Sequence, residues 1–386
     1  MGADRVFWDR HGGGWSFLVS TQKTSPFLAP QKSQKSRSHC VDDCPLGRSG
    51  EFAIDDAVQF GQKPLMRLSV ALCTFNGERY LLEQLESIEH QTRLPDEIVV
   101  CDDGSDDDTA AVIGRFASRA GVKVSLCVNP TRLGVTQNFA KAFSLCQGDL
   151  LVPCDQDDVW EPQKLAVLEA AFRDDPQLLL AFHDLALITP EGKFSGDTQW
   201  QRLNFGPGQQ GEVNAGEAFE RLLRFNIITG AAMAFRASLL NRALPVPEWF
   251  VHDEWLGLVA AATGRVRCID QPLVRYRQHD KQAIGAAASA LLSQFRHARA
   301  NMDRAYFVRL LERTQSLQER LRADADAVLH VRYHSLVSEK RSHAQARLRM
   351  RDQTLIRWPL AIGEAFRGRY GRFGYGFRSF LQDLVL

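Results

Sequence analysis

The sequence of 386 residues lacks any long hydrophobic run. No segment approaches the 18 consecutive apolar residues of a membrane-spanning helix, and charged residues such as Asp4 and Arg10 interrupt the stretch where a secretory signal would stand. With 45% hydrophobic and 24% charged residues, the chain also lacks the composition of a disordered protein. We therefore expect a folded protein with two domains of ordinary size, made and kept in the cytoplasm.

The eight cysteines lack the arrangement of a disulfide framework. Several stand within apolar runs typical of buried strands, where a thiol packs as a small apolar group. Cys40 and Cys44, together with His39, offer three zinc ligands, but a closed zinc site needs four and no second pair follows nearby. We expect neither disulfides nor a zinc site.

The net charge of +1 is close to zero, yet the charges are unevenly spread along the chain. Residues 281–386 hold 19 Lys and Arg against 9 Asp and Glu, whereas residues 1–280 hold 28 against 37. An acidic front part argues against nucleic acid as the main partner. A basic tail suits an anionic membrane surface or another polyanion.

The pattern of apolar residues divides the chain into three segments. Residues 1–65 have little apolar periodicity, so we expect a disordered N-terminal extension, with Met66 as an alternative translation start. Residues 66–284 alternate short apolar strands with amphipathic helices, which predicts an α/β domain with a doubly wound, mostly parallel sheet and helices on both faces. Residues 285–386 contain neither Gly nor Pro from Ala286 to Trp358, which predicts two or three packed helices in a basic C-terminal region.

The expected elements can be given by their residues. Strands are expected at Leu68–Thr74, Glu97–Cys101, Lys123–Val128, Asp149–Pro153, Leu178–Phe182 and Ile228–Phe235. Helices are expected at Tyr80–His90, Thr109–Arg119, Thr136–Cys146, Gln163–Arg173 and Ala215–Arg224.

The end of the chain mixes basic and aromatic side chains. Four arginines alternate with five aromatic residues between Arg367 and Phe380. This mixture suits a membrane interface, but a helical flank that covers the sheet or supports dimerisation explains the same residues. The membrane interface and the helical flank both stay open as interpretations, and the sequence does not predict the oligomeric state.

Polar residues follow three of the expected strands. In open α/β sheets, ligands bind outside the carboxyl ends of the strands, and these ends lead into Thr74–Glu78, Asp102–Asp106 and Asp155–Asp158. Clustered carboxylates repel one another unless a cation lies among them. Oxygen ligands without a Cys or His cluster favour Mg²⁺ or Mn²⁺, which usually also hold a substrate diphosphate. We predict Asp155, Asp157 and Asp158 as metal ligands, the alternative being a solvated turn before the helix that Pro162 begins.

Five sequence blocks, in this order, resemble the family 2 inverting glycosyltransferases with the GT-A fold. The first three are Val70–Gly77, Val99–Ser105 and Cys154–Trp160; the last two, His252–Leu256 and Pro272–His279, resemble the rhamnosyltransferase-like branch. Each block alone is a weak signal, but five in the right order are specific. The resemblance covers roughly residues 67–280.

The resemblance implies a donor site. The loop that lies against the nucleotide base and ribose is matched by Thr74, Phe75, Asn76 and Glu78, and the acid that accepts the N3–H of a pyrimidine by Asp103. Asp102 either binds substrate or holds the bend at Gly104–Ser105. Asp155 and Asp157 match the metal signature of the fold, with Asp158 as a candidate for the direct ligand.

The resemblance also implies a catalytic base, Asp253. Glu254 is the rival for this role because adjacent helical residues face different directions, and Asp253 could instead only cap a helix. His279 matches a histidine that could approach the diphosphate or the metal. His183 and Asp184 close a predicted strand at the same edge, where Asp184 could touch the sugar or merely make a turn.

The chain lacks the Gln-x-x-Arg-Trp signature of processive synthases, so one sugar or very few should be added. We expect metal-dependent, inverting transfer of a sugar, with L-rhamnose as a candidate, from a UDP- or dTDP-type donor to a glycan or lipid-linked acceptor. Cell-surface polysaccharide synthesis at the inner face of the cytoplasmic membrane is the expected setting. The alternatives are a nucleotidyltransferase acting on sugar phosphates and a catalytically silent nucleotide-sugar binding module.

Overall fold

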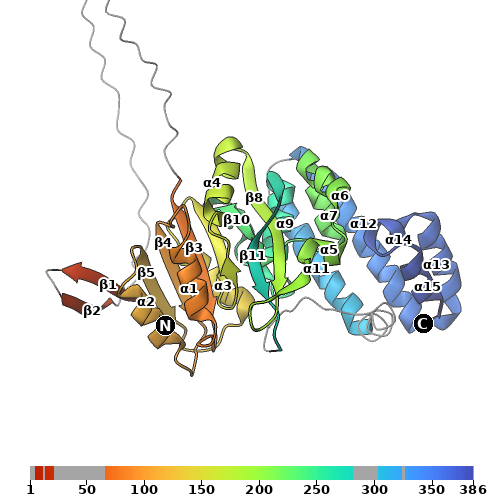
Figure 1. Ribbon diagram of the computed structural model, residues 1–386. Helices are drawn as coiled ribbons and strands as arrows, with labels where there is room; N and C mark the ends of the chain where they lie inside the picture. Colours follow the sequence, from red (N-terminus) through yellow and green to blue (C-terminus); the bar gives the residue numbers. More distant parts are fainter. Residues whose placement is uncertain (1–4, 12–13, 21–65, 281–302, 324–326, 386) are drawn as a thin grey trace, which may run out of the picture.

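The protein is built on one mixed sheet, seen in the computed structural model of Figure 1. The structure describes residues 5–11, 14–20, 66–280, 303–323 and 327–385. The strands are β1 (Arg5–His11), β2 (Gly14–Ser20), β3 (Leu68–Thr74), β4 (Glu97–Asp102), β5 (Lys123–Val128), β6 (Leu150–Asp155), β7 (Val159–Trp160), β8 (Leu178–Ile188), β9 (Phe194–Thr198), β10 (Met233–Arg236) and β11 (Arg265–Arg277).

The sheet runs in the order β2-β1-β5-β4-β3-β6-β10-β8-β11-β7, with β9 paired to β8. Strands β5, β4, β3 and β6 are parallel neighbours, and β11 is parallel to β8. Strand β10 lies antiparallel between β6 and β8, so these two strands point the same way. The carboxyl ends of β3, β4, β6, β8 and β11 therefore meet at one edge, as the predicted mostly parallel sheet requires.

Helices cover both faces of the sheet. The helices of the α/β part are α1 (Leu81–Glu89), α2 (Thr109–Ala117), α3 (Val135–Leu145), α4 (Lys164–Asp174), α5 (Gln199–Leu203), α6 (Pro207–Glu212), α7 (Ala218–Arg224), α8 (Leu240–Ala243) and α9 (His252–Thr263). Every residue of β3 is buried: Leu68, Val70 and Leu72 pack with α1, α2 and α4, while Ala71 and Cys73 face the core under α3, α7 and α9. Such continuous burial is what a parallel sheet covered on both faces demands.

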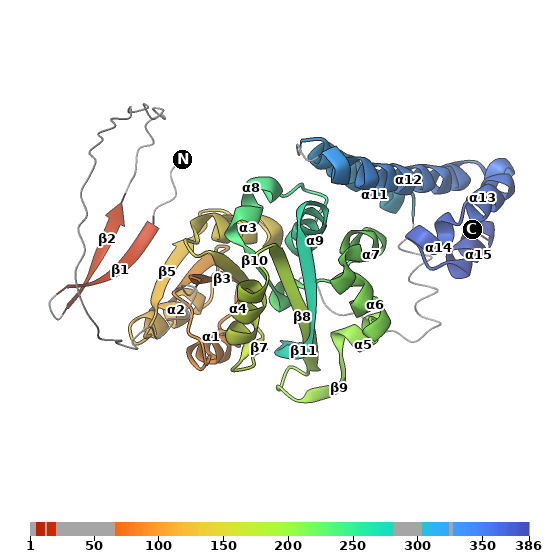
Figure 2. The same cartoon turned by 90° about the horizontal axis from the view of Figure 1, so that it is seen from above.

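The C-terminal region is helical, as predicted. Its helices are α11 (Arg304–Ala323), α12 (Ala327–Asp352), α13 (Arg357–Phe366), α14 (Arg369–Phe373) and α15 (Phe377–Val385). Leu317 of α11 and Val337 of α12 belong to the same core as Trp255 of α9, so the first two helices close one flank of the sheet (Figure 2). None of the helices in the described ranges is both long and apolar enough to cross a bilayer. The predicted boundary at residue 284 falls outside the described residues.

The N-terminal segment differs from expectation where the structure describes it. Strands β1 and β2 form an antiparallel pair, and Val6 of β1 also pairs with Leu126 of β5. Residue types of high β propensity, such as those of Val6–Trp8 and Phe17–Val19, favour strands there although we expected a disordered extension. The remaining part of residues 1–65, including the Cys40–Cys44 pair, lies outside the described residues.

The six cysteines that the structure describes are all free, and all but Cys146 are buried. They pack as small core residues, in agreement with the sequence pattern.

Candidate active site at the carboxyl edge of the sheet

The loop after β3 is held by its neighbours through a close set of hydrogen bonds. The side-chain amide of Gln156 accepts from the Phe75 N–H (2.8 Å) and donates to the Phe75 carbonyl (3.0 Å). A Cβ at Gly77 would lie 2.2 Å from the Gln156 Oε1, so a larger residue there would displace the amide that holds Phe75. Asn76 has a φ of 49° in the left-handed region, which Asn tolerates better than most residues. Gln156 is thus a positioning residue to which the sequence pattern assigned no role.

Glu78 and Thr74, two of the predicted nucleotide contacts, face protein groups. The exposed Glu78 accepts from the Asp108 N–H (3.1 Å), and the buried Thr74 hydroxyl donates to the Asp102 Oδ1 (2.7 Å). The Phe75 ring, in contrast, is half-buried and carries the Arg132 guanidinium 3.7 Å from its centre. This exposed arginine was not anticipated from the sequence and lies beside the predicted base-binding acid.

The two acids after β4 have different surroundings. The buried Asp102 accepts from the Thr74 hydroxyl and from both the hydroxyl and the N–H of Ser105. These contacts hold the turn, which favours the second of the two roles considered for Asp102. Asp103 accepts from the Asn129 amide (2.9 Å) and the backbone N–H groups of residues 133 and 134 (2.7 and 2.8 Å). One of the roughly four acceptor positions of the Asp103 carboxylate is left for a ligand.

The acidic turn after β6 divides into two groups. Asp158 is fully buried; its Oδ1 accepts from the Arg277 N–H (3.2 Å), and its Oδ2 has no partner in the described residues. Asp155 and Asp157 stay partly exposed, and the Asp157 Oδ2 lies 2.8 Å from the His279 Nε2. Because Asp158 is enclosed behind the turn, the expectation that it is a direct metal ligand is not supported by its geometry.

Buried negative charges crowd this turn. Burial raises the pKa of Asp155 to about 7, and the negative charges of Asp157 and Asp253 add to this effect. Burial also raises the pKa of Asp158 well above its usual range, and the charges of Asp157 and Asp155 add to this effect. Burial, followed by the charges of Asp155, Asp158, Asp157 and Asp253, raises the pKa of the Tyr276 hydroxyl, so all four carboxylates affect this one residue. A divalent cation is the ordinary way to relieve such repulsion.

The residues present fit a cation that shares its ligands with a substrate. No group of three or more His, Cys, Asp or Glu side chains in the described residues is arranged to hold a metal by itself. Mg²⁺ usually binds through one or two carboxylates together with substrate phosphates. Asp155 and Asp157, two carboxylates of one turn, supply such a partial set, and the His279 Nε2 lies 2.8 Å from the Asp157 Oδ2.

Arg277 and Lys164 support the turn from behind. Arg277 is 1% exposed and donates through Nε to the Asp157 carbonyl (2.9 Å) and through Nη2 to Glu83 (2.6 Å). Lys164, also buried, donates to the Ala231 carbonyl (2.8 Å) and lies 3.5 Å from the centre of the Trp160 ring. Burial lowers the pKa of Lys164 to about 7 although nearby acids oppose this. Neither residue was predicted, since a buried cation has no signature in periodicity.

The start of α9 places Asp253 at the site. His252 is buried, and its ring stacks on that of Phe139 with 4.1 Å between the ring centres. Trp255 is also buried, and its Nε1–H donates to the Ala243 carbonyl (2.6 Å). These two anchors, three residues apart, fix the rotation of the helix. The Asp253 carboxylate then accepts from the Gly230 N–H (3.0 Å) and the Glu254 N–H (2.6 Å). Burial raises the pKa of Asp253 to about 7, which suits a general base.

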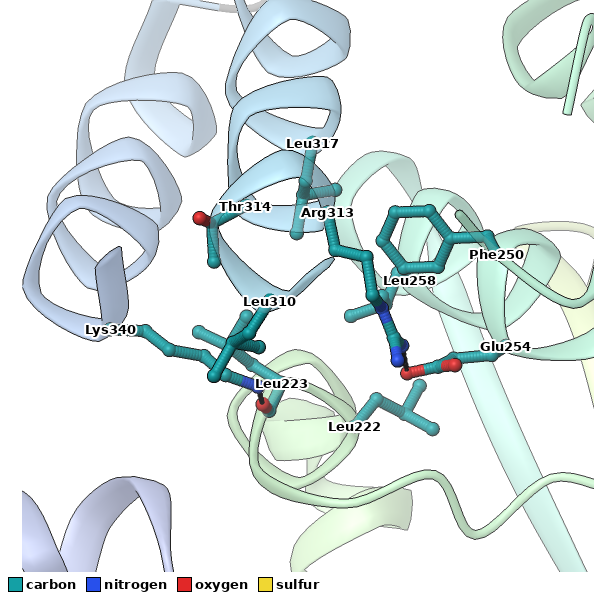
Figure 3. A pocket seen from close by; sticks show the side chains of 10 residues that line it. All are labelled: Leu222, Leu223, Phe250, Glu254, Leu258, Leu310, Arg313, Thr314, Leu317 and Lys340. Atoms are coloured by element: carbon teal, nitrogen blue, oxygen red, sulfur yellow. Dashed lines mark hydrogen bonds and ion pairs between the residues drawn. The ribbon is translucent and has the colours of Figure 1, made fainter. Parts of the chain in front are cut away.

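Glu254 points away from the aspartates. Figure 3 shows its carboxylate against the Arg313 guanidinium of α11, in a pocket lined mainly by leucines between the sheet domain and the C-terminal helices. In the same pocket the Lys340 Nζ donates to the Leu223 carbonyl. The two rivals have different partners, because Asp253 accepts from the Gly230 N–H whereas Glu254 pairs with Arg313.

His183 and Asp184 do not close a strand, because β8 continues to Ile188. The Asp184 Oδ1 accepts from the N–H groups of Leu185 (2.8 Å) and Trp200 (2.9 Å), which fastens α5 to β8. The His183 Nδ1–H donates to the Asp184 carbonyl (2.7 Å), and burial lowers the pKa of His183 to about 3. The prediction of a strand end was therefore wrong, and the contacts of Asp184 are structural.

Comparisons with known proteins agree with the fold. Residues 69–241 match the family model of glycosyl transferase family 2. An uncharacterised protein of Mycobacterium tuberculosis is 25% identical over 219 residues, which are 55% of this chain and 59% of that protein. An uncharacterised glycosyltransferase of Nostoc is 26% identical over 251 residues, which are 62% of this chain and 73% of the relative. The chain thus spans about three fifths of the first curated relatives.

Among solved structures, S. aureus TarS in complex with UDP-GlcNAc is similar, with a TM-score of 0.48 and 16% identity over 83% of this chain and 82% of that one. The family match over residues 69–241, a little under half of the chain, agrees with the coarser part of the resemblance. The rhamnosyltransferase-like branch stays a prediction.

Proposed function

We propose that the protein is an inverting family 2 glycosyltransferase that moves one sugar from a nucleoside-diphosphate donor to an acceptor hydroxyl. The observation that carries the proposal is the convergence of Asp155, Asp157 and Asp253 at the carboxyl edge of the sheet, within and just beyond the matched segment. Acids from β6 and α9, more than 90 positions apart in the chain, meet at this edge. A binding module would gain nothing from such repulsion.

In the proposed reaction, Asp253 takes the proton of the acceptor hydroxyl. The acceptor oxygen forms a bond to the anomeric carbon while the bond from that carbon to the diphosphate oxygen breaks, and the electron pair leaves with the diphosphate. One in-line displacement inverts the anomeric configuration. The pKa of about 7 keeps a large fraction of Asp253 unprotonated at neutral pH while leaving it basic enough to accept a proton. The Gly230 N–H fixes the carboxylate for that task.

Asp155 and Asp157 would hold Mg²⁺ or Mn²⁺ together with the donor diphosphate, with His279 bonded to Asp157 beside them. The ion would supply positive charge that stabilises the departing diphosphate. Arg277 holds the Asp157 backbone from behind, so the turn keeps its shape whether or not a ligand is bound.

The nucleotide would lie over the loops after β3 and β4. The Phe75 ring with Arg132 offers a stacking surface beside Asp103, whose remaining acceptor position suits the N3–H of uracil or thymine. We therefore propose a UDP- or dTDP-sugar as the donor. Asn76 and Glu78 shape this loop through their bonds to residues 105–108, and direct contact of Thr74, Glu78 or Asp102 with the nucleotide is not needed for the proposal.

For the sugar and acceptor we propose L-rhamnose and a glycan or lipid-linked acceptor, from the resemblance of His252–Leu256 and Pro272–His279 to the rhamnosyltransferase-like branch. The setting would be cell-surface polysaccharide synthesis at the inner face of the cytoplasmic membrane, with the protein attached peripherally.

The proposed function is tested by incubating the purified protein with a panel of UDP-, dTDP- and GDP-sugars, with Mg²⁺, Mn²⁺ or EDTA. We expect hydrolysis of a UDP- or dTDP-sugar that requires metal and is lost in Asp157→Asn. Undiminished turnover in EDTA would contradict the metal role. Formation of a nucleotide-sugar from a sugar phosphate and a nucleoside triphosphate would favour a nucleotidyltransferase, and tight binding without turnover would favour a silent module.

A further inference from the structure

The last helices of the chain are amphipathic with the apolar side turned outward. In α13, the residues Trp358, Ile362 and Phe366 follow one another at intervals of four and therefore share a helix face. Their exposed fractions are 58%, 43% and 88%. The residues that α13 buries are Ala361 and Glu364. A helix that packed by its hydrophobic face would show the reverse distribution.

Helix α15 repeats this arrangement. Phe377, Leu381 and Val385 again stand four residues apart and are 71%, 42% and 76% exposed. The buried residues of α15 are Ser379 and Asp383. The two helices contact each other and lie side by side at the C-terminal end of the molecule (Figures 1 and 2). We call the six apolar residues of α13 and α15 the apolar tip.

Polar bonds, rather than apolar packing, hold these helices in place. Asp383 accepts two bonds from Arg347 of α12 (2.6 and 2.9 Å) and one from the Tyr370 hydroxyl (2.8 Å). Glu364 lies 2.7 Å from the His343 Nδ1 and 2.9 Å from the Arg369 Nη1. Because these buried bonds already fix α13 and α15, their apolar side chains are free to meet something outside the molecule.

The apolar tip is a concentration, not the usual scatter of surface apolar residues. Of the seventeen large apolar side chains that are exposed in the described residues, eight lie between Leu355 and Val385. Single exposed apolar residues are normal on soluble proteins, but a contiguous group marks an interaction surface.

The charge around the apolar tip is of one sign. From residue 353 to 385 the only acids are Glu364 and Asp383, and both are buried and paired. The exposed charges in this range are arginines: Arg367, Arg372 and Arg378, of which Arg367 lies 3.6 Å from the Glu364 carboxylate. Arg372 is paired with Glu339. A second copy of the chain would bring these like charges together, whereas anionic lipid headgroups would complement them.

We propose that α13 and α15 form a membrane-docking surface in which the apolar tip enters the headgroup region of an anionic bilayer and the arginines pair with lipid phosphates. This surface differs from the stretch of Arg367–Phe380 expected from the sequence, because Tyr370 is buried and Phe373 and Phe380 are half-buried. The inference deepens the peripheral attachment that is part of the proposed function, and it does not depend on the transfer reaction.

The test is co-sedimentation of the full chain with vesicles of phosphatidylcholine, with and without phosphatidylglycerol. We expect binding to the mixed vesicles that weakens as the NaCl concentration rises. The triple variant Trp358→Ser/Ile362→Ser/Phe366→Ser should lose at least about tenfold in affinity. The matched control is Phe194→Ser/Val331→Ser, which removes two apolar residues of similar exposure, 59% and 70%, from other helices and strands and should leave binding unchanged.

A second variant, Arg367→Glu/Arg378→Glu, keeps the apolar tip and should abolish the preference for phosphatidylglycerol. Melting temperatures of the triple variant and of Phe194→Ser/Val331→Ser should match that of the unmodified chain, since the altered side chains are exposed. Arg367→Glu/Arg378→Glu should melt slightly earlier, because Arg367 lies 3.6 Å from the Glu364 carboxylate. The proposal is overturned if the chain binds no vesicles, or if the triple variant binds as well as the unmodified chain. It is also overturned if light scattering shows a dimer that the triple variant dissociates, or if that variant melts earlier without vesicle binding, which would mean that the chain itself covers the tip.

Discussion

Buried carboxylates occur at both ends of this molecule, and their surroundings are opposite. At the sheet edge, Asp158 is buried, Asp155 and Asp253 are partly exposed, and the pKa values of all three are raised, chiefly by desolvation. In the C-terminal helices, Asp383 and Glu364 are buried against arginines and a histidine. Burial alone would raise the pKa of Glu364, but the bonds from His343 and Arg369 outweigh it and lower the pKa.

The comparison separates two uses of a buried acid. Breaking a buried pair costs several kcal/mol, so the paired acids of the C-terminal helices hold structure together. Unpaired acids with raised pKa values cost stability, and such groups cluster at functional sites. The expected effects of substitution are therefore opposite: loss of activity with some gain in stability at the sheet edge, and loss of stability in the C-terminal helices.

The largest expected effect is on transfer by Asp253→Asn. The substitution keeps the size of the side chain and removes its basicity, so the rate should fall by roughly 10²- to 10⁴-fold, while donor affinity changes by less than about threefold. Glu254→Gln is the matched control, because its carboxylate contacts Arg313 outside the acidic cluster. Rates and donor binding should be measured for both. Near-normal transfer by Asp253→Asn with an inactive Glu254→Gln would exchange the two roles.

The second effect is on stability, through Arg347→Met. This change leaves the Asp383 carboxylate buried without its two charged bonds and should lower the free energy of unfolding by about 3 kcal/mol. Urea denaturation measures the loss. Adding Asp383→Leu should recover most of it, since the carboxylate, left with only Arg351 at 3.8 Å as a charged partner, is then removed. An unchanged midpoint in Arg347→Met would mean that the ion pair is not buried in solution.

The third effect is a pH dependence of stability at the sheet edge. Asp253 has a pKa of about 7 when folded, above the value of about 4 in an unfolded chain, so the folded state binds the proton more tightly. Its contribution should therefore fall as pH rises from about 4 to about 7. In EDTA at pH 8, Asp253→Asn should be more stable than the unmodified chain by about 1 kcal/mol, and at pH 4 the two should melt alike. An Asn variant that melts earlier at pH 8 would contradict the assignment.

The sequence predicted the sheet better than the site. Strands such as Leu68–Thr74 and Lys123–Val128 were predicted at their observed bounds, because short segments rich in Val, Leu and Cys are read directly from residue type. Antiparallel β10 was predicted too long, since Gly230–Ala232 is equally apolar yet forms a 3₁₀ turn under the Lys164 ammonium and beside Asp253. Three-dimensional neighbours, not propensity, decide that turn.

Within the site, the sequence indicated which residue types gather but not which way they point. Adjacent acids such as Asp157 and Asp158, or Asp253 and Glu254, are equivalent in a sequence pattern. In the structure, His252 and Trp255 set the rotation of α9, and the Arg277 backbone turns Asp158 inward. Side-chain direction depends on such distant contacts, and for the same reason the roles of Gln156 and Arg277 could not be predicted.

The smallest expected effect concerns the N-terminal strands. A chain that begins at Met66 lacks β1 and β2, but β1 joins the main sheet through a single residue pair at the edge strand β5, so few contacts with the rest of the sheet are lost. The melting temperature should change by less than about 2 °C, and transfer should be unchanged. Calorimetry and rate measurements on the shortened chain check both. A fall of more than about 5 °C would show that the hairpin stabilises β5, and lost transfer at an unchanged melting temperature would place part of the substrate site before Met66. Either outcome would add a third region to the comparison, whereas no change would confine stability and chemistry to the two sets of buried acids.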